Sequence, residues 1–464
     1  MLNSEVILYL DGGLPLYGTV SYFTNYLINN TLNRLVNETA FSFRETYSQL
    51  EEDIRHSVNS KDIKSLHLRN LNIAYTTVER QLLGMGENNM NQSGVQYKPG
   101  LEGVIAAETA ISLLDTEKEQ IIIKGHDLIE LSKENDYLDI IYLLFKGDLP
   151  TAMEKEQLEQ LLKENYQVPV QVNDILHILP KSTHPMDGQR TGISVLAGFD
   201  ESIDDRSELA NLKRSYSLLA KLPTITVNSY RILNGERAVE PIDLTYSANF
   251  LYMITGNIPS EVETAIFDRS LLLYSEHEMP NSTFTARVIA STQSDMYSAL
   301  TGAVASLKGN LHGGANEAVM YMLKDAETVE DFELMIKQKL RNKEKVMGFG
   351  HRVYMRKMDP RAEIMKQSLR QLSDLDNDYT LLEMCEAGEK VMKEEKDLYP
   401  NLDFYAAPVY YKLGIPIELY TPIFFSARTV GLCAHVMEQH ENNRIFRPRV
   451  KYIGERSQET TGRL

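Results

Sequence analysis

Hydrophobic positions recur along this chain mostly at the three- and four-residue spacing of amphipathic helices. Between Glu154 and Tyr166, for example, Leu158, Leu161 and Leu162 fall on one face of such a helix. The same kind of pattern predicts further helices over Asp204–Leu222, Ser247–Ile258, Ala286–Lys308, Val329–Leu340, Arg361–Leu375 and Ala427–Gln439. The pattern therefore predicts a mainly α-helical fold.

Strand patterns are few and short. The clearest is Ile121–Lys124, which stands directly before a glycine and a histidine. We expect it to pair with one of two apolar segments, Gly103–Ile105 or Ala110–Leu114. Only a small sheet is expected beside the helices.

The segment Gly86–Ser93 is polar and aperiodic, which is typical of a linker. It separates an N-terminal piece from the rest of the chain. That piece has helix signals at Tyr22–Leu35, Tyr47–Ser57 and Leu71–Leu83, but no motif that carries chemistry. We expect residues 1–96 to be a helical extension and linker used in packing or assembly.

The bulk composition narrows the class of protein. A chain of 464 residues predicts two or three domains, or one large two-lobed fold. A net charge of −17 argues against nonspecific binding to nucleic acid or to anionic membranes. Two cysteines, Cys385 and Cys433, cannot form a disulfide scaffold. No apolar run approaches the roughly 20 residues that span a bilayer, and no secretory signal is apparent. We therefore expect a cytoplasmic protein.

One segment departs from the acidic balance. Residues 341–370 carry nine Lys/Arg against three Asp/Glu. Within this segment, Gly348–Gly350 leads directly to His351, and glycines let backbone N–H groups approach a ligand closely. Histidine suits proton transfer near neutral pH, and Arg361 offers a bidentate donor for carboxylate or phosphate. This pattern predicts a site for a small anion, with a surface loop before a basic helix as the alternative.

Two further histidines stand in distinctive surroundings. His277 lies between two carboxylates, just before the helix-start signal Asn281–Thr283. It could donate a hydrogen bond to an anionic substrate, or simply cap the helix. His312 is surrounded by glycines at a junction between helices. The positive end of a helix dipole disfavours imidazolium, so a neutral His312 could hydrogen-bond a carbonyl oxygen that becomes an enolate. A tight turn is the alternative.

Asp403 is the one carboxylate that stands beside an aromatic pair, Phe404 and Tyr405. Desolvation there would raise its pKa, as a general base requires, although Asp403 could equally cap the following helix. A metal site is not expected, because the histidines lie tens of residues apart and no HExxH or HxH spacing occurs. No Walker loop, Rossmann glycine triad or GxSxG motif is present either.

Taken together, these segments resemble the citrate synthase family. The resemblance runs from Tyr97–Val104 to Phe446–Arg449. It rests on ordered matches at SEHEMPNST, LHGGANE, GFGHRVY, DPR, NLDFY, SART and RPR. The segments YPNLDFYAAPVYYKLGIP and YTPIFFSART are most similar to those of bacterial 2-methylcitrate synthases.

The resemblance implies a two-domain helical fold with a small domain inserted in a large one. The large domain would comprise residues 97–314 and 412–464, and the small domain residues 315–411. The resemblance also implies a homodimer whose sites each borrow a residue from the partner subunit. The N-terminal piece, residues 1–96, has no counterpart in this resemblance.

The implied reaction joins an acyl-CoA to oxaloacetate with water and needs no cofactor, since the CoA thioester is itself a substrate. The implied activity is that of a 2-methylcitrate synthase, with propionyl-CoA as substrate and acetyl-CoA also accepted. Citrate synthase itself is one alternative, because a hydrophobic pocket discriminates a methylene by only about 1–3 kcal/mol. A non-catalytic CoA-binding paralogue is another. A degenerate copy should have lost His312, His351 or Asp403, and all three are present.

The resemblance also implies a role for individual residues. Asp403 would remove the proton alpha to the thioester carbonyl, and His312 would hydrogen-bond the thioester oxygen. His351 would polarise the ketone of oxaloacetate and give it a proton. The residues that hold oxaloacetate would be His277, Arg361, Arg428 and, from the partner subunit, Arg447. The residues that receive CoA would be Gly348, Phe349, Gly350 and Arg356.

Overall fold

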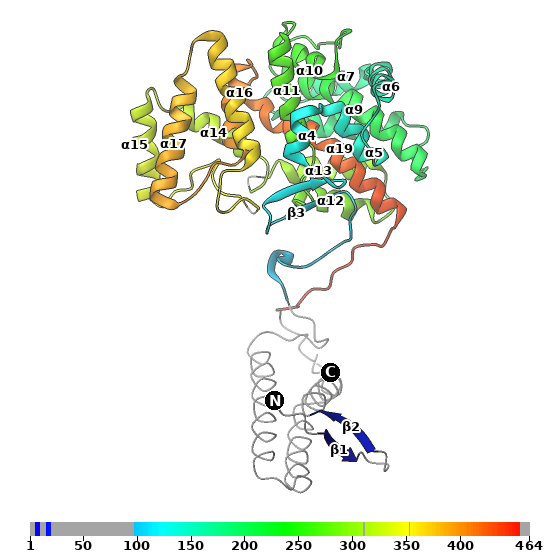
Figure 1. Cartoon of the computed structure of the whole chain (residues 1–464). Coiled ribbons are helices and arrows are strands. Elements are labelled where there is room, and N and C mark those ends of the chain that lie inside the picture. Colours follow the sequence, from blue (N-terminus) through cyan, green and yellow to red (C-terminus); the bar gives the residue numbers. More distant parts are fainter. Residues whose placement is uncertain (1–4, 10–14, 20–96, 310, 352, 455–464) are drawn as a thin grey trace, which may run out of the picture. The chain divides into compact units, whose positions relative to one another are not determined.

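The computed structural model describes residues 5–9, 15–19 and 97–454, apart from 310 and 352 (Figure 1). Its chain divides into two compact units, Met1–Ala106 with Arg449–Leu464, and Ala107–Pro448. In the first unit, β1 (Glu5–Tyr9) pairs antiparallel with β2 (Pro15–Thr19). Neither strand was expected from the sequence. The helices predicted in the N-terminal piece lie outside the described residues.

The second unit begins with a small antiparallel sheet. Its strands are β3 (Ser112–Asp115), β4 (Gln120–Ile123) and β5 (His126–Asp127), in that order across the sheet. Leu114 lies opposite Ile121, so the predicted strand pairs with the second of the two candidate segments, not the first. Ile121 and Ile123 are buried and anchor the sheet to the helices.

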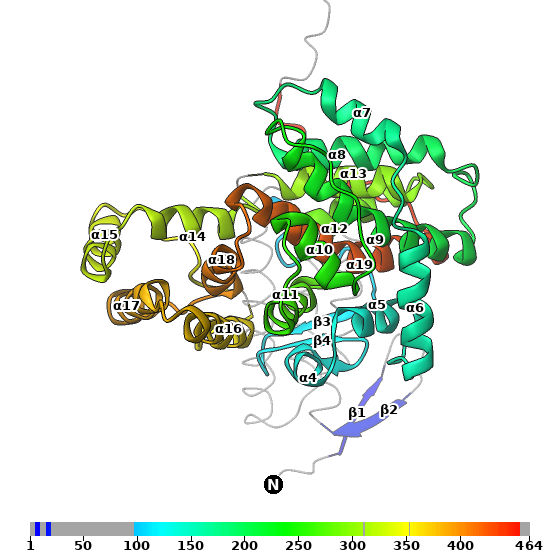
Figure 2. The same ribbon diagram turned by 90° about the horizontal axis from the view of Figure 1, so that it is seen from above.

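Helices make up most of the second unit, as predicted (Figures 1 and 2). The helices up to Leu307 are α4 (Leu128–Glu134), α5 (Tyr137–Lys146), α6 (Ala152–Glu164), α7 (Val170–Ile178), α8 (Pro185–Leu196), α9 (Glu208–Arg231), α10 (Tyr246–Thr255), α11 (Glu261–Tyr274), α12 (Asn281–Ala290) and α13 (Met296–Leu307). The helices from Ala315 onward are α14 (Ala315–Lys324), α15 (Val329–Arg341), α16 (Pro360–Asp376), α17 (Thr380–Lys396), α18 (Leu402–Lys412) and α19 (Tyr420–Glu441). The second unit also has the short 3₁₀ turns η2 (Ala197–Phe199) and η3 (Ile417–Leu419), whereas η1 (Pro99–Leu101) belongs to the first unit.

Two predicted helices have other bounds in the structure, for identifiable reasons. The helix predicted over Ala286–Lys308 is broken into α12 and α13, because Gln293 adopts a left-handed conformation and Asp295 caps a new helix. Helix α9 continues past Leu222 through Pro223 to Arg231, since burial of the following side chains outweighs the cost of an interior proline. Leu161 is 37% exposed, whereas Leu158 and Leu162 are buried.

Helix α19 is the central element of the fold. It lies against α9, α11, α12 and α13, and it is buried along most of its length (Figures 1 and 2). A helix that is buried on all sides needs no polar face, so its hydrophobic positions show weak helical periodicity. This explains why the predicted helix began at Ala427 and missed the first two turns.

Helices α14 to α18 form a group to one side of the other helices in both views (Figures 1 and 2). Within this group α15 packs on α17, and α18 packs on both α14 and α16. The group runs from Ala315 to Lys412, which exceeds by one residue the expected small domain, residues 315–411. That domain division stays a prediction.

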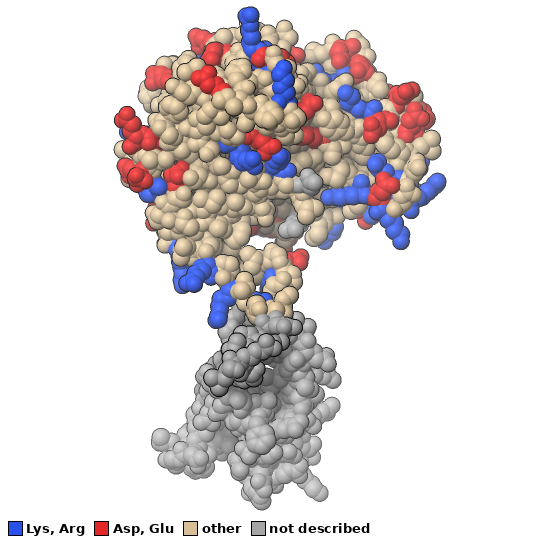
Figure 3. All heavy atoms as spheres, turned by 180° about the vertical axis from the view of Figure 1, so that it is seen from behind, with Lys and Arg blue, Asp and Glu red and all other residues tan. Residues whose placement is uncertain are grey.

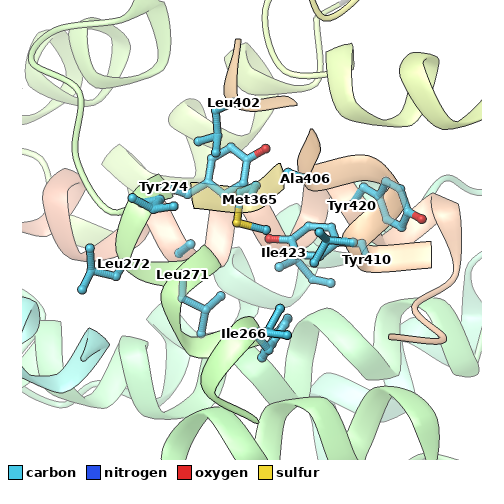
Figure 4. Packing of buried hydrophobic residues seen from close by; sticks show 14 of the residues in the cluster. Ile266, Leu271, Leu272, Tyr274, Met365, Leu402, Ala406, Tyr410, Tyr420 and Ile423 are labelled. Carbon is cyan, nitrogen blue, oxygen red and sulfur yellow. The ribbon is translucent and has the colours of Figure 1, made fainter. Parts of the chain in front are cut away.

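A continuous buried cluster joins this group to the rest of the unit (Figure 4). Met365 of α16 and Leu402 of α18 belong to it, as do Leu271 and Tyr274 of α11 and Ile423 of α19. Each fully buried side chain of this size contributes about 1.5–3 kcal/mol. The cluster therefore fixes the ends of α11, α16 and α18, which carry the candidate site.

The surface shows no single dominant charge on the face drawn in Figure 3, where acidic and basic side chains are interspersed. Among the described residues, no helix combines the length and the apolar character that crossing a bilayer demands.

Candidate active site

Three of the predicted residues meet directly. His277 follows α11, His351 lies in the loop before α16, and Arg361 is in the first turn of α16. The Nε2 atoms of the two histidines are 3.2 Å apart, and Arg361 Nη2 lies 3.0 Å from His351 Nε2. The fold thus brings together side chains that are 74 residues apart in the sequence.

Asp359 holds Arg361 in place. The carboxylate is fully buried and forms a two-pronged contact, with Arg361 Nη2 at 2.8 Å and Nε at 3.1 Å. Burial raises the pKa of Asp359, but Arg361 outweighs this and keeps that pKa below its usual value. Asp359 also caps α16 by accepting the backbone N–H of Arg361. The sequence analysis noted the DPR motif but gave Asp359 no role.

The two ring nitrogens of His351 have different partners. Its Nδ1 accepts the backbone N–H groups of Val353 and Tyr354, at 3.1 and 3.3 Å. An N–H only donates, so these contacts favour an unprotonated Nδ1, but Arg361 Nη2 also only donates and faces Nε2 at 3.0 Å. Burial and then Arg361 lower the pKa of His351 to about 4. At neutral pH the ring of this histidine is therefore uncharged.

The hydrogen bonds of His312 define its tautomer. Its Nε2 accepts the backbone N–H of Ser282 at 3.2 Å and contacts Ser282 Oγ at 2.9 Å, so its proton is on Nδ1. Burial, followed by the charge of Arg428, lowers the pKa of His312 to about 4. The neutral state agrees with prediction, but burial is the main cause, rather than the helix dipole. Ser282 was missed, although it stands within the SEHEMPNST motif.

Asp403 is the second residue of α18, and Asn401 is the helix cap. The capping alternative for Asp403 is therefore wrong. The Tyr274 hydroxyl donates to Asp403 Oδ1 at 2.6 Å. Burial raises the pKa of Asp403, outweighing the opposite effects of Tyr274 and Arg361. A carboxylate with raised pKa, as predicted from its aromatic neighbours, is suited to proton abstraction.

Arg428 lies buried on α19, close to these groups. Its Nε donates to the backbone oxygen of Tyr274 at 2.6 Å, and its guanidinium lies 4.9 Å from the centre of the Phe424 ring. Burial lowers the pKa of Arg428 to about 10, so it remains charged at neutral pH. The positive charge of Arg428 acts to lower the pKa values of His277, His312 and Asp403.

Glu276, which is 0% exposed, anchors the loop that carries His277. Its Oε1 accepts Ser112 Oγ at 2.8 Å and contacts His435 Nε2 at 3.2 Å. Ser112 Oγ in turn accepts the backbone N–H of Glu278, whose φ is +57°. These contacts stabilise an uncommon backbone conformation beside His277. No sequence spacing could reveal them, because Ser112 lies on β3.

The glycine loop is tied to the segment before α18. Gly350 N–H donates to the carbonyl oxygen of Tyr399 at 2.9 Å, and Asn401 N–H donates to that of Gly348, also at 2.9 Å. Phe349 packs on Phe404 with their ring centres 4.5 Å apart. Some of the peptide groups expected to receive CoA are therefore engaged within the protein. Among the described residues, the N–H of Phe349 has no hydrogen-bond partner.

The two loop glycines differ in the space around them. Both have positive φ, but a Cβ on Gly348 would lie 2.8 Å from Phe404 and Val319, whereas one on Gly350 would meet only Leu398 at 3.9 Å. We expect Gly348→Ala to lower the free energy of unfolding by about 1–3 kcal/mol more than Gly350→Ala. Urea titrations of both variants measure this difference, and equal losses would contradict the role of close packing.

Two predicted residues lie apart from this cluster. Arg356 is exposed in the loop before α16. Arg447 is exposed beyond α19 and makes no hydrogen bond or ion pair with the described residues. Their assignments stay predictions. Within the described part of the chain, no group of His, Cys, Asp and Glu is arranged to hold a metal ion.

The chain is similar to known proteins over most of its length. The family model for the C-terminal domain of citrate synthase matches residues 100–449. The chain is 66% identical over 363 residues to a citrate synthase of Heyndrickxia coagulans, covering 78% of this chain and 97% of that protein. It is 64% identical over 363 residues to the citrate/2-methylcitrate synthase of Bacillus subtilis, covering 78% of this chain and 98% of that protein.

Solved structures are similar as well. Citrate synthase from Pyrobaculum aerophilum matches with a TM-score of 0.74 and 34% identity, over 80% of this chain and 96% of that one. The enzyme from Thermoplasma acidophilum, solved as a ternary complex with carboxymethyl coenzyme A and oxaloacetate, matches with a TM-score of 0.74 and 29% identity. That match covers 78% of this chain and 98% of the other.

Proposed function

Since the chain belongs to the citrate synthase family, whose members are acyltransferases that condense acyl-CoA with oxaloacetate, we propose that its own substrates are oxaloacetate and propionyl-CoA, with acetyl-CoA also accepted. The observation that carries this proposal is the convergence of a buried carboxylate and two neutral histidines beside two buried arginines. The CoA thioester is a substrate, and the proposed reaction needs no cofactor.

Oxaloacetate is a dianion, and Arg361 and Arg428 are the forks proposed to hold its carboxylates. The Asp359 contact leaves Arg361 pre-oriented, which reduces the entropy lost when the ligand binds. His277, which lies beside His351, is proposed as a further side chain that binds oxaloacetate. With its proton on Nε2 once oxaloacetate occupies Arg361, His351 would donate to the ketone oxygen and supply the proton when that oxygen becomes an alkoxide.

The thioester is proposed to bind between Asp403 and His312. Asp403 removes a proton from the carbon alpha to the carbonyl, and Oδ2 is the atom free for this because Oδ1 accepts Tyr274. The Nδ1–H of His312 donates to the carbonyl oxygen as it becomes an enol. The enol carbon attacks the polarised ketone, and water then hydrolyses the thioester of the product. Movement of residues 315–411 would exclude water until condensation.

CoA binding is assigned to Gly348, Phe349, Gly350 and Arg356. The free N–H of Phe349 supports a backbone contact with the adenine, and exposed Arg356 is available for phosphate. We further propose a cytoplasmic homodimer in which Arg447 of the partner subunit enters the site. The exposure of Arg447 and its lack of any ion pair with the described residues support this.

The choice of acyl chain rests on the sequence resemblance and on the 64% identical relative that is named citrate/2-methylcitrate synthase. We expect kcat/KM for propionyl-CoA to equal or exceed that for acetyl-CoA. The ratio should stay within roughly 10–200-fold, which is the discrimination that a hydrophobic pocket achieves for one methylene. Spectrophotometric assay of CoA release with both thioesters measures the ratio. A strong preference for acetyl-CoA would leave citrate synthase as the activity. Absence of release with either would favour a non-catalytic CoA-binding protein.

A further inference from the structure

Tyr274 touches two of the groups to which the proposed function gives a role. Its hydroxyl donates to Asp403 Oδ1 at 2.6 Å, and its backbone oxygen accepts Arg428 Nε, also at 2.6 Å. It is the last residue of α11, so its carbonyl belongs to the negative end of that helix and suits a cation. Tyr274 is fully buried in the cluster of Figure 4, and its ring packs against Phe424 at 4.8 Å.

The Tyr274–Asp403 bond has a fixed direction. Burial raises the pKa of the Tyr274 hydroxyl far above neutral, so this group remains a donor. A hydroxyl that donates to a carboxylate favours the ionised form of that carboxylate. It also occupies Oδ1 and leaves Oδ2 for the substrate. Tyr274 therefore acts on the charge state of Asp403 and on the orientation of its free oxygen.

The other groups that face Asp403 come from three elements. Arg361 and Asp359 face it from the start of α16, Arg428 from α19, and Tyr410 from α18 itself. The two arginines support the ionised carboxylate, whereas Asp359 opposes it. Once the carboxylates of oxaloacetate neutralise both arginines, most of that support is lost. The Tyr274 hydroxyl then remains as the uncharged donor that still favours ionised Asp403.

Building on the proposed function, we propose that Tyr274 is a positioning residue that keeps Asp403 ionised, with Oδ2 directed at the thioester, after oxaloacetate has bound. The assignment concerns a hydroxyl that acts through the base and does not itself contact the reacting carbon. It also explains why one residue contacts both the base and an oxaloacetate-binding arginine: its backbone is held by Arg428 while its side chain holds Asp403.

The test is the pH dependence of kcat and of kcat/KM for the acyl-CoA in Tyr274→Phe. Loss of the donor disfavours the ionised base, so the acid limb of both profiles should move up by about one to two pH units. The loss of activity should be largest on the acid side of the profile, and activity should recover toward that of the unmodified enzyme as the pH rises. The KM for oxaloacetate should change little, because the backbone contact with Arg428 is kept.

Tyr246→Phe is the matched control. Tyr246 is also buried, and its hydroxyl donates to the backbone oxygen of Leu219 at 3.0 Å, away from Asp403. This control should leave both profiles unchanged. A loss in Tyr274→Phe that is the same at every pH, or no loss at all, would overturn the inference. If Asp403→Asn still abolishes CoA release in that case, the proposed function stands and only the role of Tyr274 fails.

A second substitution at position 274 keeps the aromatic ring and should move the acid limb of the pH profile in the opposite direction. Incorporation of 3,5-difluorotyrosine at position 274 makes the hydroxyl a stronger donor while it stays protonated in its buried surroundings. The acid limb should then move to lower pH, opposite to the shift in Tyr274→Phe. A shift of the acid limb to higher pH would overturn the inference. This test does not depend on whether the phenylalanine variant folds.

Discussion

Asp403→Asn is expected to lower kcat for CoA release by about 10³–10⁴-fold with either propionyl-CoA or acetyl-CoA. The amide has nearly the same shape and can still accept the Tyr274 hydroxyl, but it cannot take a proton from carbon. No neighbouring carboxylate can replace it, because Asp359 is buried in its ion pair with Arg361. The fold and the binding of oxaloacetate should be retained, so the loss should lie in kcat, measured by steady-state assay together with calorimetric binding of oxaloacetate.

The chain offers a close control in Asp397, which accepts the Tyr399 hydroxyl at 3.1 Å but is exposed. Asp397→Asn makes the same chemical change to a tyrosine-bonded carboxylate outside the cluster, and it should leave kcat within about twofold. If Asp403→Asn released CoA at an unchanged rate with either thioester, Asp403 could not be the base, and the mechanism proposed above would be wrong.

His312→Ala is expected to lower kcat by about 10²–10³-fold, the usual loss when one donor to a developing oxyanion is removed. The tautomer assigned from Ser282 makes a sharper prediction. The amide nitrogen of Asn lies near the position of Nδ1, whereas that of Gln lies near Nε2. Since Nδ1–H is the proposed donor, His312→Asn should retain more activity than His312→Gln. Steady-state kinetics of the three variants at pH 7.5 measure this order.

The opposite order, with Gln above Asn, would mean that Nε2–H is the donor and that the Ser282 contact rearranges when substrate binds. Melting temperatures of the three variants, measured alongside their rates, check that each variant is folded. Protonation of His312 does not complicate the comparison, because its pKa of about 4 keeps it neutral throughout the assay range.

Much of the architecture was accessible from local pattern. Amphipathic periodicity located α6, α15 and α16 almost to the residue, because each has one apolar face against the core and one face in water. The same argument failed for α19, which is buried all round, and for α12 and α13, where a left-handed residue and a new cap interrupt a continuous apolar pattern. Periodicity reports burial of one face and is insensitive to both situations.

By itself the sequence determined the helical class and the presence of histidine, arginine and aspartate in glycine- or aromatic-bordered motifs. It also determined the family to which those motifs belong. Only the tertiary structure decided which atoms meet: Tyr274 with Asp403 across 129 positions, and Ser282 with His312 across 30. Tautomers, pKa shifts and the free oxygen of the proposed base follow from those contacts. They depend on burial and on hydrogen bonds between distant segments, which local spacing along a chain does not encode.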